Sequence, residues 1–190
     1  MVEITTSRLR LRELRPGDWR AVHAFGSDRE VMRFMLAGGP FTERQSRAYV
    51  AEAMAWAREV PRTNYVFAIT LLPGGELIGG CRLGITSHER READVGYGIR
   101  RDHWNQGYGT ETLRALLHFG FSELKLNRIC AEVVAANARS IRVLEKAGMR
   151  REAEFKERLW FEERWWDSYL YALERREWEG DVASYRRGRD

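Results

Sequence analysis

The segment VGYGIRRDHWNQGYGTET, residues 95–112, constrains the fold more than any other part of the chain. It begins as an apolar strand, and a turn with Gly107 and Gly109 then leads into a helix expected to begin near Tyr108. The first N–H groups of a helix have no acceptor within it, and glycines let a phosphate approach such a backbone closely. The turn (residues 104–110, here called the Gly107 turn) therefore predicts a pyrophosphate-binding site. A tight strand-to-helix connection without a ligand would favour the same residues.

Two better-known phosphate-binding motifs do not account for this turn. A dinucleotide-binding fold would need the spacing GxGxxG and an acidic residue at the end of the next strand, and neither is clearly present. A P-loop would need the frame GxxxxGK, and its lysine is missing. Gly98, within the strand, indicates a bulge or a place where another extended chain lies alongside.

A second group of polar residues, Asn137-Ala-Arg-Ser140, stands where a later helix is expected to begin. Asparagine is a favoured N-cap residue, and this role alone would explain Asn137 and leave Ser140 as a first-turn residue. The same position lies just beyond the end of a strand, which is where ligands bind in α/β sheets. The sequence leaves both interpretations open.

Apolar periodicity predicts the other elements. Leu9 and Leu11 alternate with arginines, which indicates a strand with one buried face. Thr42 and Gln45 form a capping box, and Gly148 is placed to end the last helix. Hairpins and helical crossovers alternate, so we expect an α/β fold with a mixed sheet. The expected strands are residues 7–13, 65–71, 77–85, 93–99, 128–134, 151–159 and 165–173, and the expected helices are a short one after residue 16 and residues 43–59, 108–124 and 138–147.

The length of 190 residues predicts a single domain, which we place at residues 1–179, followed by a polar tail at 180–190 that we expect to be mobile. No apolar run approaches the roughly 20 residues of a membrane helix, and the first residues lack the pattern of a signal peptide. We therefore expect a cytoplasmic protein without a membrane partner. Cys81 and Cys130 lie in apolar stretches whose spacing suits neither zinc nor a redox pair, so we expect buried free thiols.

Several motifs occur in series from Thr6 to Trp178. They are Thr6-Ser7-Arg8-Leu9-x-Leu11-Arg12, Gly96-Tyr97, Trp104-x-x-Gly107-Tyr108-Gly109-Thr110-Glu111, Asn137-x-x-Ser140-Ile141-x-Val143-Leu144-Glu145-Lys146-x-Gly148 and Asp167-x-Tyr169-x-Tyr171. On these residues the chain resembles the GNAT superfamily of N-acetyltransferases, and within it the RimJ/RimL-type branch, which acetylates the N-termini of ribosomal proteins. The resemblance implies an α/β GNAT fold. Its mixed, mostly antiparallel, bent sheet would have about seven strands, splay between the fourth and fifth, and be flanked by helices.

The resemblance also implies acetyl-CoA as co-substrate and no metal. The pantetheine arm would bond to the strand, and the pyrophosphate to backbone N–H groups of the Gly107 turn. Asn137 would hold the arm or orient the thioester. Arg100, Arg101 and His103 are candidates for phosphate contact, with a solvated charged loop as the alternative for each. The implied cofactor-binding residues are Gly98, Ile99, Arg100, Asn105, Gln106, Gly107, Tyr108, Gly109, Thr110 and Asn137.

Two positions depart from the usual pattern of the superfamily. Trp104 stands where the phosphate motif usually begins with Gln or Arg, but backbone donors would bind the phosphates, so binding should survive. Leu144 stands where a tyrosine often protonates the departing thiolate. By resemblance to RimL-like proteins, Ser140 is the candidate for that role, and water is the alternative.

Amide formation from a thioester requires a neutral amine, so a base that removes a proton from the ammonium should help. Asp94 is the first candidate, because acidic residues occupy this strand position in RimJ/RimL-like proteins; a surface charge without a role is the alternative. Glu152 and Glu154 are further candidates. The predicted catalytic residues are therefore Ser140 and Asp94.

We thus expect an enzyme that transfers an acetyl group from acetyl-CoA to a primary amine, either a protein N-terminus or a small molecule, by direct attack on the thioester. The alternatives are a catalytically weak acyl-CoA-binding module and a transferase for another acyl-CoA, such as succinyl-CoA. A net charge of +4 and a pI near 9.3 attract polyanions, which include both CoA and nucleic acids. No nucleic-acid motif accompanies this charge, so a nucleic-acid partner is not expected. The resemblance also suggests a homodimer.

Overall fold

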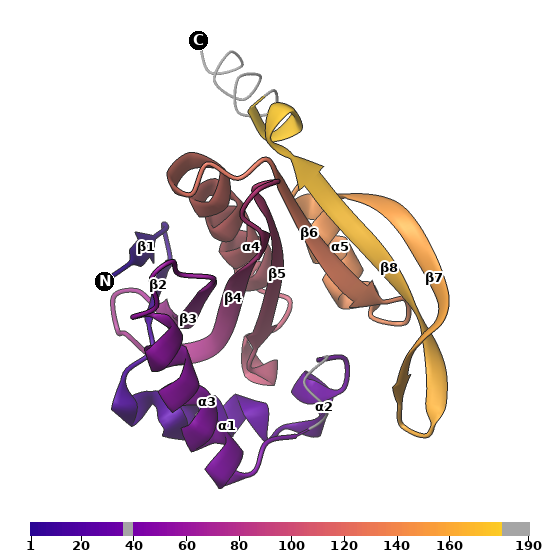
Figure 1. Cartoon of the computed structure of the whole chain (residues 1–190). Helices are drawn as coiled ribbons and strands as arrows, with labels where there is room; N and C mark the ends of the chain where they lie inside the picture. Colours follow the sequence, from indigo (N-terminus) through magenta and orange to yellow (C-terminus); the bar gives the residue numbers. More distant parts are fainter. Residues whose placement is uncertain (36–39, 180–190) are drawn as a thin grey trace. The chain divides into compact units, whose positions relative to one another are not determined.

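The computed structural model describes residues 1–35 and 40–179, so the expected tail at 180–190 lies outside the described residues. The chain divides into two compact units, one made of residues 1–84 and 95–116 and the other of residues 85–94 and the described residues from 117 onward. Figure 1 labels the elements along the chain. The strands are β1 (Glu3–Thr5), β2 (Leu9–Glu13), β3 (Asn64–Leu71), β4 (Leu77–Ser87), β5 (Glu92–Ile99), β6 (Arg128–Val134), β7 (Arg150–Phe161) and β8 (Arg164–Glu174).

The strands form one mixed sheet in the order β1-β2-β3-β4-β5-β6-β8-β7. The sheet has eight strands rather than about seven, because residues 3–5 pair antiparallel with β2 as an additional edge strand. The remaining elements are η1 (Pro16–Asp18), α1 (Trp19–Gly26), α2 (Arg29–Met32), α3 (Glu43–Trp56), η2 (Arg101–His103), α4 (Tyr108–His118), η3 (Phe119–Glu123) and α5 (Ala138–Lys146).

Strand β2 has the buried face that its alternating sequence predicts. Leu9 and Leu11 are fully buried, and burying a leucine contributes about 1.5–3 kcal/mol. Arg12, the next residue of β2, donates to Asp18 of η1 at 2.7 Å. The ion pair therefore fixes the path from β2 into the first helix.

Helices α1 and α3 lie side by side in the first unit (Figure 1). The predicted capping box is present, because the Thr42 hydroxyl accepts from the Gln45 N–H and the Gln45 side chain accepts from the Thr42 N–H. Val50 and Ala53 of α3 join a buried cluster with Val22 of α1. The helix ends at Trp56, three residues before the predicted end.

Strands β4 and β5 approach each other very closely in the first unit. A Cβ atom placed on Gly79 of β4 would lie 2.2 Å from the carbonyl oxygen of Gly98. A Cβ on Gly98 itself would only touch the Met35 side chain, at 3.7 Å. The close backbone approach that the sequence suggested near Gly98 therefore requires glycine at position 79.

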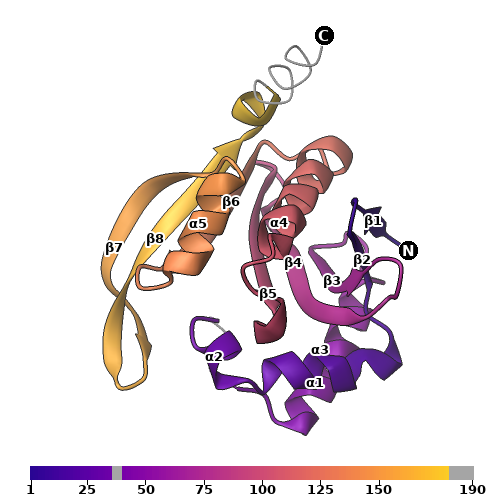
Figure 2. The same cartoon turned by 180° about the vertical axis from the view of Figure 1, so that it is seen from behind.

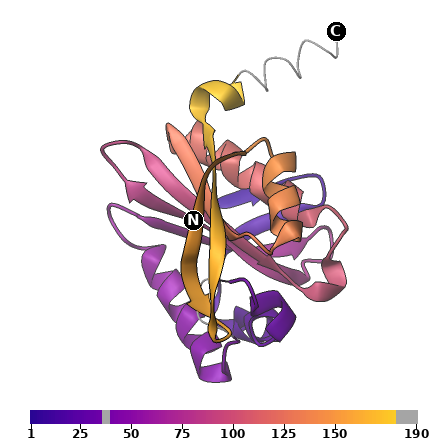
Figure 3. The same cartoon turned by 90° about the vertical axis from the view of Figure 1, so that its right-hand side faces the viewer.

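The second unit combines β6, β7 and β8 with α5. The Tyr171 hydroxyl on β8 donates to Glu145 of α5 at 3.0 Å, which attaches the helix to the sheet. Figure 2 labels both elements. Strands β7 and β8 form a long antiparallel ribbon (Figure 3). β5 pairs in parallel with β6 at residues 92–94 and 128–130, the first three residues of each strand. The splay expected farther along these two strands stays a prediction.

The predicted helix over residues 108–124 ends as an α-helix at His118 and continues as one π-helical turn, η3. Phe119, Gly120 and Phe121 are all buried there, and three consecutive buried residues do not fit the spacing of a regular helix. The last helix ends as predicted, with Gly148 at a φ of 92°.

Both cysteines are free thiols. Cys81 is buried, as predicted, and burial raises the pKa of its thiol. Cys130 is only half-buried, so this part of the prediction was wrong. Its side chain faces the Ala93 carbonyl, to which the thiol donates at 3.4 Å.

Candidate functional site

Strand β5 and helix α4 are joined by the Gly107 turn, in the first unit. The Gly107 carbonyl accepts from the Glu111 N–H at 3.0 Å, so Gly107 holds the N-cap position of α4. By helix geometry, the N–H groups of the next three residues have no acceptor within the helix. Together with the helix dipole, these donors make a site suited to an anion.

Two residues of the turn adopt left-handed backbone. Asn105 has a φ of 60° and Gly107 a φ of 85°. Asparagine tolerates this region better than most residues, and glycine adopts it freely. A Cβ at Gly107 would lie 3.3 Å from Nη2 of Arg8, so the glycine also leaves room between the turn and this guanidinium.

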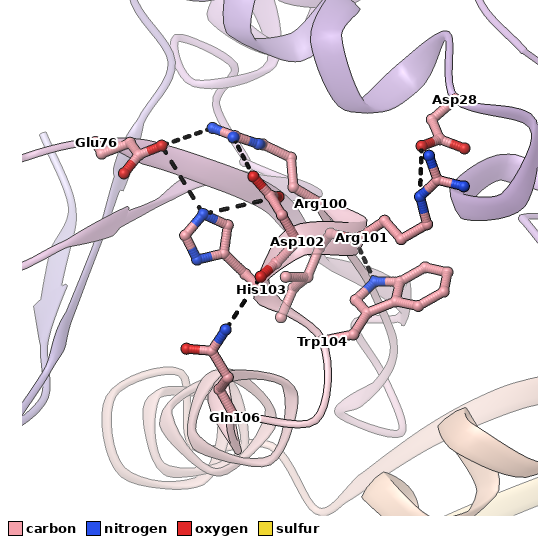
Figure 4. Close-up of polar contacts among 9 residues, drawn as sticks. Asp28, Glu76, Arg100, Arg101, Asp102, His103, Trp104 and Gln106 are labelled. Carbon is pink, nitrogen blue, oxygen red and sulfur yellow. Dashed lines mark hydrogen bonds and ion pairs between the residues drawn. The ribbon is translucent and has the colours of Figure 1, made fainter.

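Side chains within the segment hold the end of β5 and the turn in place (Figure 4). The Trp104 indole N–H donates to the Ile99 carbonyl at 2.7 Å, and the Gln106 amide donates to the Asp102 carbonyl at 3.1 Å. The Arg100 backbone N–H donates to the Ile78 carbonyl of β4 at 2.8 Å. Trp104 therefore has a structural role at the position where the superfamily usually has Gln or Arg.

The predicted phosphate-contacting side chains lie beside the turn, but each is near a carboxylate (Figure 4). Arg100 donates to Glu76 at 2.7 Å and to Asp102, and its hydrogen bond lowers the pKa of the Asp102 carboxyl. Arg101 lies 3.5 Å from Asp28, and His103 Nε2 lies 3.8 Å from both Glu76 and Asp102. Arg100 and Arg101 each lie near a carboxylate, so the backbone N–H groups of the turn are the better candidates for binding an anion.

Glu111, in the first turn of α4, is a site residue that the sequence reasoning named only as part of a motif. Its carboxylate accepts from the Thr6 hydroxyl at 2.6 Å and from the Arg8 N–H and Nε at 3.1 and 2.7 Å. Burial raises the pKa of Glu111, but the hydrogen bonds from Thr6 and Arg8 outweigh it and lower the pKa below its ordinary value. Glu111 is therefore ionised and anchors the segment before β2.

Asn137 and Ser140 lie in the second unit, at the beginning of α5. Asn137 Oδ1 accepts from the Ser140 N–H at 3.1 Å, so the capping interpretation of Asn137 is confirmed. The Ser140 side chain is half-buried. Leu144 stands at the position where the superfamily often has a tyrosine, and its side chain is buried.

The second unit also contains the candidate bases. Asp94 lies opposite Cys130 in the parallel pairing, and after burial its charge is the next cause that raises the pKa of the Cys130 thiol. Glu152 accepts two hydrogen bonds from Arg128, which lower the pKa of its carboxyl, and Glu154 pairs with Lys156. A carboxylate with a lowered pKa is a poorer proton acceptor, so Glu152 is the less suited candidate.

Glu132 on β6 is an acidic residue that the sequence reasoning missed. It accepts from the hydroxyl of the fully buried Ser168 at 2.6 Å and lies 3.6 Å from Arg158 Nε. With the two-residue period of a strand, Glu132 lies on the same face of β6 as Cys130, the neighbour of Asp94. A carboxylate between buried apolar residues of a strand was the signal in the sequence.

Comparisons with known proteins identify the family. A model of the acetyltransferase (GNAT) domain matches residues 8–150. This chain belongs to the GNAT acetyltransferase family. A GNAT relative from Bacillus subtilis (strain 168), the uncharacterized N-acetyltransferase YnaD, is 34% identical over 177 residues, which cover 93% of this chain and 99% of that protein. The chain is therefore an acyltransferase.

Solved GNAT structures confirm the predicted fold. The crystal structure of a GNAT-family acetyltransferase from Bacillus anthracis has a TM-score of 0.81 and 34% identity, and the match covers 92% of this chain and 99% of that one. RimL, a ribosomal L7/L12 alpha-N-protein acetyltransferase in complex with coenzyme A, has a TM-score of 0.81 at 16% identity, covering 91% and 98%. The second likeness concerns the fold alone.

GNAT enzymes use acetyl-CoA as acyl donor, and the Gly107 turn fits a pyrophosphate. The first-turn N–H groups of α4 are the donors that such a group needs, and Gly107, without a side chain, leaves room for it to approach them. Among the described residues, 1–35 and 40–179, no group of three or more His, Cys, Asp or Glu side chains is arranged to hold a metal ion. The expectation of a metal-free reaction stays a prediction. In the same part of the chain, no helix is long and apolar enough to span a membrane.

Proposed function

We propose that this GNAT enzyme transfers an acetyl group from acetyl-CoA to a primary amine, as the RimJ/RimL-type branch does. The observation that carries the proposal is the Gly107 turn, where left-handed backbone and the beginning of α4 present free N–H donors beside the end of β5. The motifs at Thr6–Arg12 and Asn137–Gly148 support the RimJ/RimL-type assignment. The acceptor is a protein N-terminus or a small amine.

In this proposal, the N–H groups from Asn105 to Thr110 bind the pyrophosphate. The pantetheine arm bonds to the end of β5, as the family resemblance implies for Gly98, Ile99 and Arg100. The Arg100 N–H already donates to the Ile78 carbonyl, so Arg100 would bind the pantetheine arm through another atom. Asn137 retains its amide NH₂ for the arm, since only Oδ1 caps α5.

Acetyl-CoA, when bound, supplies an acetyl carbon activated as a thioester. Asp94 accepts one proton from the acceptor ammonium, and the neutral nitrogen then forms a bond with the acetyl carbon as the C–S bond breaks. The Ser140 hydroxyl, or water, gives one proton to the departing thiolate and takes up the second proton that the nitrogen loses as it becomes an amide, so the donor is restored. The family resemblance supports these roles for Asp94 and Ser140, and Glu132 is a second candidate for the base because its carboxylate lies on the same face of the paired strands.

Calorimetric titration of the folded protein with acetyl-CoA, CoA and succinyl-CoA tests the donor. Micromolar binding of acetyl-CoA in preference to succinyl-CoA would support the proposal. No binding of any acyl-CoA would mean that the Gly107 turn only connects a strand to a helix. A panel of N-terminal peptides and polyamines then tests the acceptor by product formation.

The base can be assigned from the dependence of kcat on pH. Asp94→Asn should lower kcat and remove its rise with pH, whereas Glu132→Gln should leave the profile in place. The opposite pattern would assign the base to Glu132, and two unchanged profiles would exclude both.

A catalytically weak acyl-CoA-binding module is the second candidate function. It is favoured by Leu144, which is buried and has no proton to donate. Binding of acetyl-CoA without turnover on any amine of the panel would select it.

We further propose that residues 1–179 act as one cytoplasmic GNAT domain and form a homodimer. The exposed pair Trp160 and Trp165, opposite each other on β7 and β8, supports self-association, because large exposed aromatic side chains often mark interfaces. Light scattering of the purified protein measures the oligomeric state.

A further inference from the structure

Arg8 contacts two residues of the Gly107 turn, one on each side of Gly107. Its Nη1 donates to the Gln106 carbonyl at 3.0 Å, and its guanidinium carbon lies 4.6 Å from the centre of the Tyr108 ring. Between them, Nη2 lies 3.3 Å from the position of a Cβ on Gly107. The guanidinium therefore lies against the middle of the turn, around Gly107.

Glu111 fixes the orientation of this guanidinium. Its Oε2 accepts from Arg8 Nε at 2.7 Å and lies 2.6 Å from Nη2, a two-point pair in which the Arg8 side chain is 47% exposed and that of Glu111 only 16%. Oε1 accepts from the Arg8 N–H and from Thr6, so the backbone that carries Arg8 is held as well. A planar guanidinium held by a two-point pair has little freedom to turn away.

We propose that Arg8 and Glu111 are positioning residues that keep the Gly107 turn in the conformation that binds pyrophosphate. The inference depends on the proposed function, because it assigns a role at that donor site. Left-handed backbone at Asn105 costs some free energy even for asparagine, so contacts from neighbouring residues help to hold it. The hydrogen bond from Arg8 to Gln106, the residue between the two left-handed ones, is such a contact.

The alternative is that Arg8 binds the phosphates directly through its charge. The two roles predict opposite effects of Glu111→Gln. If Arg8 is a direct ligand, loss of the neighbouring negative charge should strengthen the binding of a polyanion. If the pair positions the turn, the same variant should weaken binding, because the guanidinium loses its fixed orientation.

The test is calorimetric titration of acetyl-CoA into the wild type, Arg8→Ala and Glu111→Gln. We expect Kd to rise about tenfold in both variants, which corresponds to the loss of one hydrogen bond to a charged group. Arg10→Ala is the matched control, since Arg10 has the same charge, is 46% exposed and pairs only with Glu3 among the contacts described, at 3.4 Å. Its Kd should change less than about twofold.

Hydrogen exchange of the protein without ligand gives a readout that does not depend on binding. The amide of residue 111, which donates to the Gly107 carbonyl, should exchange faster in Arg8→Ala and Glu111→Gln, while the amides of the β7–β8 ribbon should exchange at the wild-type rate. If Arg8→Ala does not fold, Arg8→Lys keeps the charge but not the two-point geometry, and it should show the same two effects.

Three results would overturn the inference. If the wild type binds acetyl-CoA and the folded Arg8 and Glu111 variants bind it with the same Kd, the inference is wrong but the proposed function stands. Tighter binding by Glu111→Gln would assign Arg8 as a direct ligand. No binding of acetyl-CoA by the wild type would overturn the proposed function together with the inference, and so distinguishes the two failures.

Discussion

Replacing Gly79 with alanine should force β4 and β5 apart in the first unit. An alanine Cβ at this position would stand 2.2 Å from the Gly98 carbonyl oxygen and 3.0 Å from Ile99 Cα, whereas ordinary contact begins at 3.4 Å. Both obstructing groups are backbone, so no side-chain rotation relieves the overlap. One strand must move by about 1 Å.

The cost follows from this geometry. Overpacking of a core costs about 1–3 kcal/mol when side chains can adjust, and backbone adjusts less. The nearby hydrogen bond from the Arg100 N–H to the Ile78 carbonyl would also lengthen, which adds up to about 1 kcal/mol. We expect Gly79→Ala to lower the free energy of unfolding by about 3 kcal/mol and Tm by about 6–12 °C. Acetyl-CoA should bind more weakly, because Gly98 and Ile99 move.

Gly80→Ala, one residue along β4, is the matched control. Its Cβ would lie 3.5 Å from Phe25 Cζ, an ordinary contact, and an alanine restricts the unfolded chain. We therefore expect a change of less than about 1 kcal/mol, in the stabilising direction. Urea unfolding followed by circular dichroism compares the two variants. If Gly79→Ala unfolds at the same urea concentration as Gly80→Ala, the strands separate without cost and the reasoning is wrong.

The remaining predictions concern the site and acid stability. Gly107→Asp should weaken acetyl-CoA binding about a hundredfold, since it places a negative charge and a side chain at a φ of 85° against the phosphates; calorimetry of the folded variant checks this. Ser140→Ala should lower kcat about tenfold with unchanged acetyl-CoA affinity, and equal rates from pH 6 to 9 would remove Ser140 from the mechanism. Burial raises the pKa of Asp18, but the hydrogen bonds from the Arg12 side chain and the Arg15 N–H, together with the positive charge of Arg12, outweigh it and the net shift is downward. The contribution of Asp18 to stability is therefore complete above the unfolded pKa of about 3.9 and is lost as pH falls through the lower folded value. Asp18→Asn should therefore cost about 2 kcal/mol at pH 7 and progressively less below about pH 4 in urea unfolding; a constant difference down to pH 2 would contradict this.

Local patterns in the sequence predicted most of the fold. The alternation at Leu9 and Leu11, the capping box at Thr42 and the glycine at position 148 all act within a few residues, so each could be recognised without the rest of the chain. Strand β1 was missed because three residues at an edge carry no usable periodicity. The π-helical turn was missed because Phe121 and Leu124 continue the apolar spacing of the helix before it, which predicts a regular helix to residue 124.

The site was predictable where it consists of backbone. The Gly107 turn depends on glycines and a helix beginning, which the sequence shows directly. The roles of Arg8 and Glu111 depend on a pairing between residues 103 positions apart, for which the sequence gives no local signal. Glu132 was missed for a related reason, because its partner Ser168 lies on another strand, 36 positions away.

The anchoring of Thr6 and Arg8 by Glu111 has a consequence for how the protein is made. During synthesis, the segment that carries Thr6 and Arg8 leaves the ribosome more than 100 residues before its partner does. Contacts of such sequence separation form late, since the long loop between them must close first. Glu111 can therefore anchor this segment beside the Gly107 turn only after α4 has emerged, and fusions attached close to residue 6 would disturb contacts whose other partners are encoded in the second half of the gene.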